Sequence, residues 1–189
     1  MSELGLSQET IDTAGTTLGV SGANEAKRVQ KEYMQNHRLN IPTLLMADII
    51  HGFRTIFPIP LALGSTWDEA AVEKMAEISA KEAAVSGLHV TFSPMVDLVR
   101  DPRWGRVMES TGEDPLLNSR LAAAMVRGYQ GENLKEDNWR VAACVKHFAA
   151  YGGALAGRDY NTVDMSERQL REMYLPGYKA GLDAGAKLV

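Results

Sequence analysis

The sequence predicts an α/β fold built on a parallel sheet. Apolar, strand-like runs begin near residues 43, 89, 141 and 186, and helical patterns fill the stretches between them. This alternation is typical of parallel strands joined by crossover helices. The longer polar loops follow the strands, which is where both eight-stranded barrels and doubly wound sheets carry their function.

The first half of the chain predicts two helices and one strand. Residues 22–39 carry apolar side chains at helical spacing. A short buried strand follows over residues 43–47 and ends at Asp48. Asp68 is a favourable N-cap for a long helix that runs through Ser86 and stops at Gly87.

The second half repeats this order. A strand over residues 89–93 leads into a long polar loop, and Pro115 opens a helix that reaches Tyr129 and closes at Gly131. The third strand covers residues 141–145. A helix over residues 166–183 should kink at Pro176, before a last strand begins at residue 187.

The two ends of the chain shape the expected domain organisation. The chain stops a few residues into an apolar run, and no convincing strand precedes residue 22. A complete barrel takes about 250 residues, so four strands make roughly half of one. We therefore expect residues 1–189 to form only part of a barrel domain.

Composition excludes several classes of protein. The formal net charge of -4 gives no basic surface for nucleic acid or an anionic membrane. No apolar run approaches a membrane span, and residues 1–3 lead into a polar stretch. With Cys144 as the single cysteine, no intrachain disulfide can form. We favour the cytoplasm, while a periplasmic or secreted location and an oligomer stay open.

Charged side chains follow each predicted strand. They are Asp48, His51 and Arg54 after the first, Asp97 and residues 100–106 after the second, and Lys146 and His147 after the third. Such a cluster suits a polyhydroxylated ligand, because carboxylates accept hydrogen bonds from hydroxyls while Lys, Arg and His donate to oxygens. A sugar-binding module without catalysis would use the same groups. The glycines of residues 152–157 leave a third alternative, a nucleotide-binding loop, although its Lys-Ser/Thr ending is missing.

The order of short motifs over residues 36–189 resembles the amino-terminal domain of family 3 glycoside hydrolases. The motifs are Asp48…His51-Gly52, Arg103-Trp104-Gly105-Arg106…Glu109-Ser110, Glu113-Asp114-Pro115 and Lys146-His147-Phe148. Residues 157–164 are similar to the β-glucosidase branch. The resemblance implies a (β/α)8 TIM-type barrel, followed in full-length members by an α/β sandwich domain. It implies retaining, exo-acting hydrolysis of terminal non-reducing β-D-glucosyl residues, without a cofactor or metal; a β-xylosidase or another exo-glycosidase of the family is the alternative.

By the same resemblance, six residues should bind substrate. They are Asp48, Arg106, Lys146, His147, Arg54 and Arg158. Asp48 should hold sugar hydroxyls far from the anomeric carbon, in subsite -1. No catalytic carboxylate is assigned to this chain, because the nucleophilic aspartate of the family lies on a strand beyond Val189 and the acid/base follows later. The expected partners are a β-glucoside or oligosaccharide and the complementary carboxyl-terminal part of the enzyme.

Lys146 and His147 raise a geometric question. Neighbouring side chains of a strand point to opposite faces, so both cannot normally reach one ligand. Structures of the family break this alternation with cis peptide bonds around the Lys-His-Phe segment. The resemblance therefore predicts a non-proline cis bond at Lys146–His147 or His147–Phe148.

Overall fold

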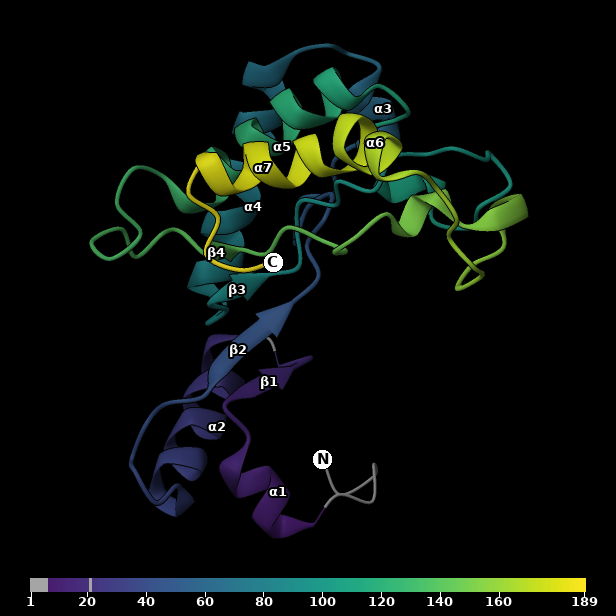
Figure 1. The fold of residues 1–189 in the computed structure, drawn as a ribbon. Helices are drawn as coiled ribbons and strands as arrows, with labels where there is room; N and C mark the ends of the chain where they lie inside the picture. Colours follow the sequence, from purple (N-terminus) through teal and green to yellow (C-terminus); the bar gives the residue numbers. More distant parts are fainter. Residues whose placement is uncertain (1–6, 21) are drawn as a thin grey trace.

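A four-stranded parallel sheet lies at the centre of the computed structural model, which describes residues 7–20 and 22–189 (Figure 1). The strands are β1 (Thr16–Leu18), β2 (Leu44–Ala47), β3 (Val90–Thr91) and β4 (Ala142–Ala143), and they neighbour one another in chain order. All three pairings are parallel, and Cys144 makes a further parallel bridge to Leu188. This sequential order is that of a barrel, whereas a doubly wound sheet reverses its order. The predicted α/β fold with a parallel sheet is confirmed.

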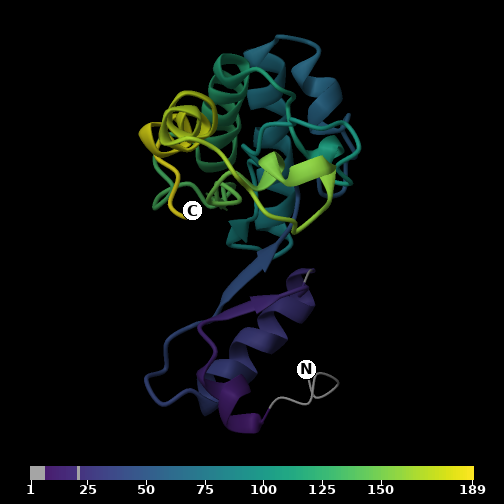
Figure 2. The same ribbon diagram turned by 45° about the vertical axis from the view of Figure 1, so that its right-hand side comes forward.

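Helices connect the consecutive strands. The longer ones are α2 (Ala23–Asn36), α4 (Glu69–Val85), α5 (Pro115–Gln130) and α7 (Leu175–Asp183). The shorter ones are α1 (Gln8–Thr13), α3 (Pro60–Gly64) and α6 (Glu167–Gln169), with turns η2 (Val107–Glu109), η3 (Tyr151–Gly153), η4 (Leu155–Gly157) and η5 (Leu170–Tyr174). Figures 1 and 2 show α1 and α2 together beside β1, and α4, α5 and α7 gathered around the other end of the sheet. In the part of the chain described, no helix has the length and apolar character needed to cross a membrane.

The predicted helix boundaries agree with the observed caps. Asp68 accepts a hydrogen bond from the backbone N–H of Ala71 at 2.9 Å, which satisfies one free donor of the first turn of α4. Pro115 lies in the first turn of α5, where its missing N–H costs nothing. Gly131 ends α5 with a φ of 61°, a conformation that glycine adopts without steric penalty.

One expectation is wrong. A strand does precede residue 22: β1 pairs with β2 through the register of Thr16 with Leu44. Only the central residue of β1 is buried, and its Thr17 hydroxyl meets that of Thr43 at 3.1 Å, so no apolar run marks the strand. The helix expected over 166–183 is present without a gap as α6, η5 and α7, and it is irregular next to Pro176, where a kink was expected. The π-helical turn η5 lies directly before the turn that contains Pro176, which has no N–H to continue the regular hydrogen bonds. The chain start at residues 1–6 lies outside the described residues.

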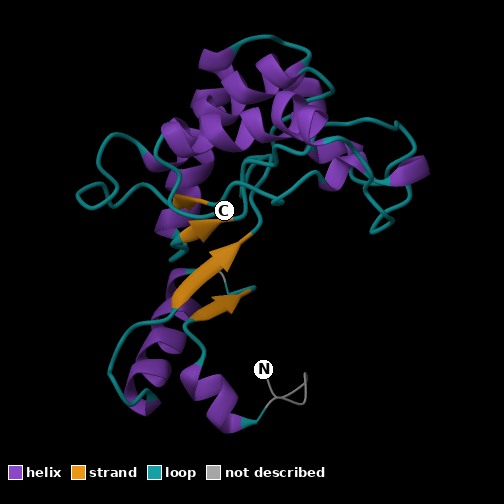
Figure 3. Ribbon diagram, viewed as in Figure 1, coloured by secondary structure: helices purple, strands orange, loops and turns teal. Residues whose placement is uncertain are grey.

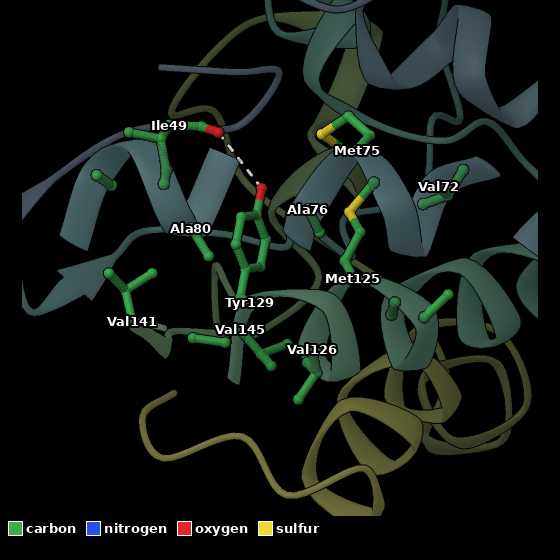
Figure 4. Packing of buried hydrophobic residues seen from close by; sticks show 14 of the residues in the cluster. Ile49, Val72, Met75, Ala76, Ala80, Met125, Val126, Tyr129, Val141 and Val145 are labelled. Atoms are coloured by element: carbon green, nitrogen blue, oxygen red, sulfur yellow. Dashed lines mark hydrogen bonds between the residues drawn. The ribbon is translucent and has the colours of Figure 1, made fainter. Parts of the chain in front are cut away.

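The strands are short, and loops and helices surround them (Figure 3). The core therefore depends on helices packed against the sheet. Figure 4 shows Tyr129 of α5 among side chains of α4 and of the β4 region, with its hydroxyl donating to the Ile49 carbonyl at 3.3 Å. Gly128 allows α4 and α5 to approach closely, since a Cβ there would lie 2.3 Å from the Glu73 carbonyl oxygen. This packing holds the sheet whose carboxyl end carries the charged cluster.

Candidate active site

Side chains that follow β2, β3 and β4 meet at the carboxyl end of the sheet, as predicted. Lys146 extends its Nζ to within 2.6 Å of Oδ2 of Asp48. The Arg106 guanidinium, from the loop after β3, lies with NH1 3.3 Å from Nε2 of His147. The structure therefore brings together four of the six residues expected to bind substrate.

Glu109 joins the two cations of this cluster. Its Oε1 accepts from Arg106 Nε at 2.6 Å and its Oε2 from Arg106 NH2 at 2.7 Å, while Lys146 Nζ lies 3.5 Å from Oε2. Arg106 caps the 3₁₀ turn η2, and in such a turn side chains three positions apart are eclipsed. Burial alone would raise the pKa of Glu109, but the hydrogen bonds from Arg106 and the charge of Lys146 lower it overall.

His147 is held from the opposite side by Asp97. The Nδ1 atom lies 2.7 Å from Asp97 Oδ2, and the same oxygen accepts the His147 backbone N–H at 3.0 Å. The hydroxyl of Tyr178, on α7, donates to the His147 carbonyl oxygen and lies 3.2 Å from Asp97 Oδ1. Burial and the neighbouring carboxyl of Asp97 raise the pKa of the Tyr178 phenol, which keeps this hydroxyl a donor.

The peptide bond between Lys146 and His147 is cis, which confirms the predicted position. A second non-proline cis bond joins Phe148 to Ala149, and this bond was not predicted. The Lys146 side chain is 9% exposed and the His147 side chain 32% exposed. The two neighbours thus belong to one cluster at different depths.

Tyr151 forms an aromatic wall against the cluster. Its ring centroid lies 5.5 Å from the Arg106 guanidinium carbon and 5.0 Å from the centroid of the His147 ring, which it meets edge to face. The Tyr151 hydroxyl and the indole N–H of Trp104 both donate to Oδ1 of Asp159, at 2.5 and 2.9 Å. These two hydrogen bonds lower the pKa of Asp159 and fix the segment after β4 to the loop after β3.

A hollow of about 330 Å³ opens beside the cluster. It is lined by Asp48, Ile50, His51, Gly52, Arg106, Met108 and Glu109. Its volume lies at the lower end of the range for small-ligand sites. His51 lines this hollow, and its buried Nδ1 has no hydrogen-bond partner among the described residues.

A larger hollow of about 990 Å³ lies near the amino end of β4, beside α4 and α5. Two of its acidic side chains form ion pairs: Glu73 meets Arg127 at 2.8 Å and Glu77 meets Arg140 at 3.3 Å. None of the residues expected to bind substrate lines this hollow, whereas Asp48 and Arg106 line the smaller one, so we assign the site to the smaller hollow. Within residues 7–20 and 22–189, no group of three His, Cys, Asp or Glu side chains is arranged to hold a metal.

Arg54 and Arg158 lie outside the cluster. Arg54 is exposed, its guanidinium lies 5.9 Å from the ring of Phe53, and its backbone N–H donates to Glu82 at 2.8 Å. Arg158 is exposed in the segment after η4. Neither arginine lines the smaller hollow.

The glycines of residues 152–157 serve packing. A Cβ on Gly152 would lie 2.2 Å from the Leu98 carbonyl oxygen, and one on Gly157 would lie 2.9 Å from Cγ of Asp101. The segment forms the 3₁₀ turns η3 and η4, and helix α6 begins only at Glu167. The phosphate-binding geometry, in which a glycine-rich loop runs straight into a helix N-terminus, is not present here.

Several residues of the site were not among the six expected to bind substrate. They are Asp97, Glu109, Tyr151, Asp159 and Tyr178. The three-residue spacing of Arg106 and Glu109 was a usable signal, because Pro102 and Gly105 exclude a regular helix but allow a tight turn. Tyr178 gave no signal, since its contact with Asp97 joins residues 81 positions apart.

The fold and the cluster define a class of protein: a parallel α/β barrel segment with linked carboxylates and cations at the carboxyl end of its strands. Residues 12–189 match the sequence profile of the glycosyl hydrolase family 3 N terminal domain, and the chain belongs to this family. The barrel resemblance is thereby confirmed, and the match extends from residue 36 back to residue 12.

Relatives of known sequence and structure agree with this assignment. The periplasmic beta-glucosidase of Salmonella typhimurium is 47% identical over 165 residues, which cover 87% of this chain and 21% of that protein. A beta-xylosidase of Formosa agariphila is 36% identical over 93% of this chain and 26% of its own length. The beta-glucosidase of Listeria innocua, crystallised with isofagomine, superposes with a TM-score of 0.95 at 59% identity, over 99% of this chain and 26% of that one.

The chain thus spans about a quarter of the length of the Listeria beta-glucosidase, with 26% covered, and 21% of the Salmonella one. It holds part of the (β/α)8 barrel of the family, as the sequence predicted. The four strands described here are those of that part.

Proposed function

We propose that this chain is the sugar-binding part of the barrel of a retaining, exo-acting β-glucosidase. The observation that carries the proposal is the linked cluster of carboxylates and cations beside the smaller hollow. The relatives support it: the Listeria innocua beta-glucosidase has been crystallised with glucose, with gluconolactone and, as a mutant, with laminaribiose. The substrate would be a β-glucoside or an oligosaccharide with a terminal β-D-glucosyl residue.

Asp48 is the residue best suited to hold a sugar in subsite -1. Its side chain is 47% exposed and lines the hollow, while one of its oxygens is held by Lys146. A carboxylate has about four lone-pair sites, so capacity remains for hydroxyl hydrogens. Arg106, Lys146 and His147 would then bind sugar oxygens around it. Arg54 and Arg158 lie outside the cluster, so they would contact only parts of the substrate that extend beyond this sugar.

The catalytic carboxylates would lie outside this chain, on the rest of the barrel and a following α/β sandwich domain. A retaining glycosidase needs two carboxyl groups about 5 Å apart, one of them free to attack the anomeric carbon. The carboxyl of Asp97 is fully buried, and Glu109 is occupied by two cations. The reaction we propose needs no cofactor, and the complementary part of the enzyme would be the main protein partner.

The experiment uses the full-length protein and two chromogenic substrates, 4-nitrophenyl β-D-glucoside and 4-nitrophenyl β-D-xyloside. Faster glucoside hydrolysis, with the β-anomer as the first product by ¹H NMR, would support the proposal. The beta-xylosidase relative gives the second candidate, which a preference for the xyloside would favour. Sugar binding without turnover would indicate a non-catalytic module, and release of the α-anomer would contradict a retaining mechanism.

A further inference from the structure

We propose that Asp97 is a positioning residue, which acts on the substrate only through His147 by fixing the orientation of the ring and keeping its proton on Nδ1. This inference rests on the proposed function, in which His147 binds the sugar. The resemblance to family 3 gave Asp97 no role. Its role follows instead from its contacts.

Asp97 contacts both the backbone and the ring of His147. One oxygen, Oδ2, lies 3.0 Å from the backbone nitrogen and 2.7 Å from Nδ1. Because the backbone N–H and the ring of His147 both bind Oδ2 of Asp97, the ring is fixed relative to the His147 backbone. The Asp97 side chain has no exposed area, so these contacts do not compete with water.

The same contacts decide where the ring carries its proton. Oδ2 of Asp97 already accepts the backbone N–H, so it acts as an acceptor toward Nδ1 as well, and Nδ1 carries the hydrogen. On the other side of the ring, Arg106 NH1 lies 3.3 Å from Nε2, and a guanidinium can only donate. Nε2 therefore presents its single lone pair outward, to Arg106 here, and it would accept a sugar hydroxyl only where that hydroxyl takes the place of the guanidinium.

His147 needs such support because it lies outside the regular strand. β4 ends at Ala143, and the last bridge before His147 is the isolated one of Lys146 to Met95; His147 itself makes no helix or strand hydrogen bond. The Tyr178 hydroxyl, on α7, contacts both His147 and Asp97: it donates to the His147 carbonyl oxygen and lies close to Oδ1 of Asp97. The Tyr151 ring contacts the His147 ring edge to face, with 5.0 Å between centroids, and leaves the His147 side chain 32% exposed.

The test is a double-mutant cycle in the full-length protein, with kcat and KM measured on 4-nitrophenyl β-D-glucoside. Asp97→Ala should lower kcat/KM by about 10- to 100-fold, by analogy with the loss caused by removing the hydrogen-bond partner of a metal-bound histidine. In a His147→Ala background the same change should cause no further loss, because Asp97 acts only through that ring. Equal losses in the two backgrounds would show a structural role and overturn the inference, as would full activity of Asp97→Ala.

A matched control separates positioning from stability. Asn118 is also buried, and its side chain donates to Thr111 Oγ1 at 2.9 Å, away from His147. Asn118→Ala should lower the unfolding temperature while kcat/KM of the folded protein stays unchanged. If Asp97→Ala does not fold, Tyr178→Phe takes its place, since it removes a single hydroxyl; its smaller loss of kcat/KM should also vanish in the His147→Ala background.

A second measurement is independent of glucosidase activity. Diethylpyrocarbonate modifies neutral histidine nitrogens, and peptide mass spectrometry reports the rate for each histidine. At about pH 8, above the ordinary histidine pKa, both nitrogens of His147 are engaged, and Asp97→Ala frees one of them. The rate at His147 should rise several-fold and the rate at His37 should not change. An unchanged rate at His147 overturns the inference; a wild type that binds or cleaves no glycoside instead contradicts the proposed function.

Discussion

Nζ of Lys146 lies 2.6 Å from Oδ2 of Asp48, although the two residues are 98 positions apart in the sequence. One follows β4 and the other follows β2, so the pair spans the strand that lies between them. The Lys146 side chain is 9% exposed, whereas that of Asp48 is 47% exposed. The buried lysine therefore fixes a carboxylate that stays open on its outer side.

Asp48→Asn in the full-length protein should reduce kcat/KM for an aryl β-glucoside. The loss of transition-state stabilisation should be about 2–3 kcal/mol, because a charge-assisted hydrogen bond to substrate is lost. The asparagine keeps the shape of the side chain, so folding should be little affected. Asp183→Asn is the control, since Asp183 is an exposed residue of α7 that pairs with Lys179. Equal kinetics for the Asp48 variant and the control would count against the assigned role.

Glu109→Gln tests the acceptor that joins the two cations. Glutamine replaces one carboxylate oxygen with an NH2 group and removes the negative charge, so it can no longer accept from Arg106 Nε, Arg106 NH2 and Lys146 together. We expect kcat/KM to fall by about 1–3 kcal/mol, the usual cost of an unsatisfied buried partner. Glu113→Gln, at an exposed position of the same loop, should leave the kinetics unchanged. A loss of similar size in that control would indicate a general disturbance of the loop.

His89 should make the stability of the fold sensitive to acid. Its Nδ1 accepts the backbone N–H of Leu45 at 2.9 Å, and partial burial lowers the pKa of the ring below 6.5. The unfolded chain therefore binds the proton first: the contribution of His89 is complete above pH 6.5 and is lost as the pH falls through the lower, folded-state value. His89→Asn retains an acceptor that does not titrate. Urea unfolding of both proteins across this range should show a weaker pH dependence in the variant, and identical slopes would refute this origin.

Gly128→Ala should destabilise the fold by about 1–3 kcal/mol, the typical cost of overpacking. The added Cβ would lie 2.3 Å from the Glu73 carbonyl oxygen, which is backbone and cannot rotate away. Gly105→Ala is the matched control, because a Cβ there meets no heavy atom within 4 Å and needs no unusual φ. Thermal unfolding of the two variants compares them directly, and equal midpoints would show that α4 and α5 can separate at little cost.

The 189-residue chain by itself should not hydrolyse glucosides. Positioning groups without a nucleophile and an acid leave the oxocarbenium-like transition state without its main electrostatic partners. The measurement compares the purified chain, its mass verified, with and without the complementary carboxyl-terminal part. Turnover by the chain alone, at the rate of the full-length protein, would place the catalytic carboxylates among the residues described here.

Most of the sheet and its helices could be predicted because their signals are local. Asp68 with its cap and Pro115 at a helix start are recognisable from a few neighbours. β1 was not predicted because its buried residue is Thr17, whose hydroxyl meets that of Thr43. Two threonines do not form an apolar run. The observed strands are also shorter than the apolar runs, since the regular hydrogen bonds between strands stop where the backbone bends toward the loops.

The candidate site was predictable to the extent that it follows strand ends. Parallel strands place their carboxyl ends at one edge, so Asp48 and Lys146 could be brought together from the sequence. Arg54 and Arg158 could not be judged in this way, because each lies on an irregular segment whose direction no local rule determines. The contact of Asp97 with His147 depends on where the chain turns after Pro94 and after Lys146, which periodicity does not report.

The strand order has a consequence for how the protein is made. Each strand pairs with the strand that left the ribosome just before it, so no strand has to wait for a distant partner. Growth of the sheet can therefore follow synthesis, one strand and one helix at a time. Asp48 is made early and stays without its cation until β4 is added, and Lys146 and His147 reach the edge last. The groups expected to bind ligand would come together only as that fourth strand docks, which ties the gain of affinity to a late step in the assembly of this segment.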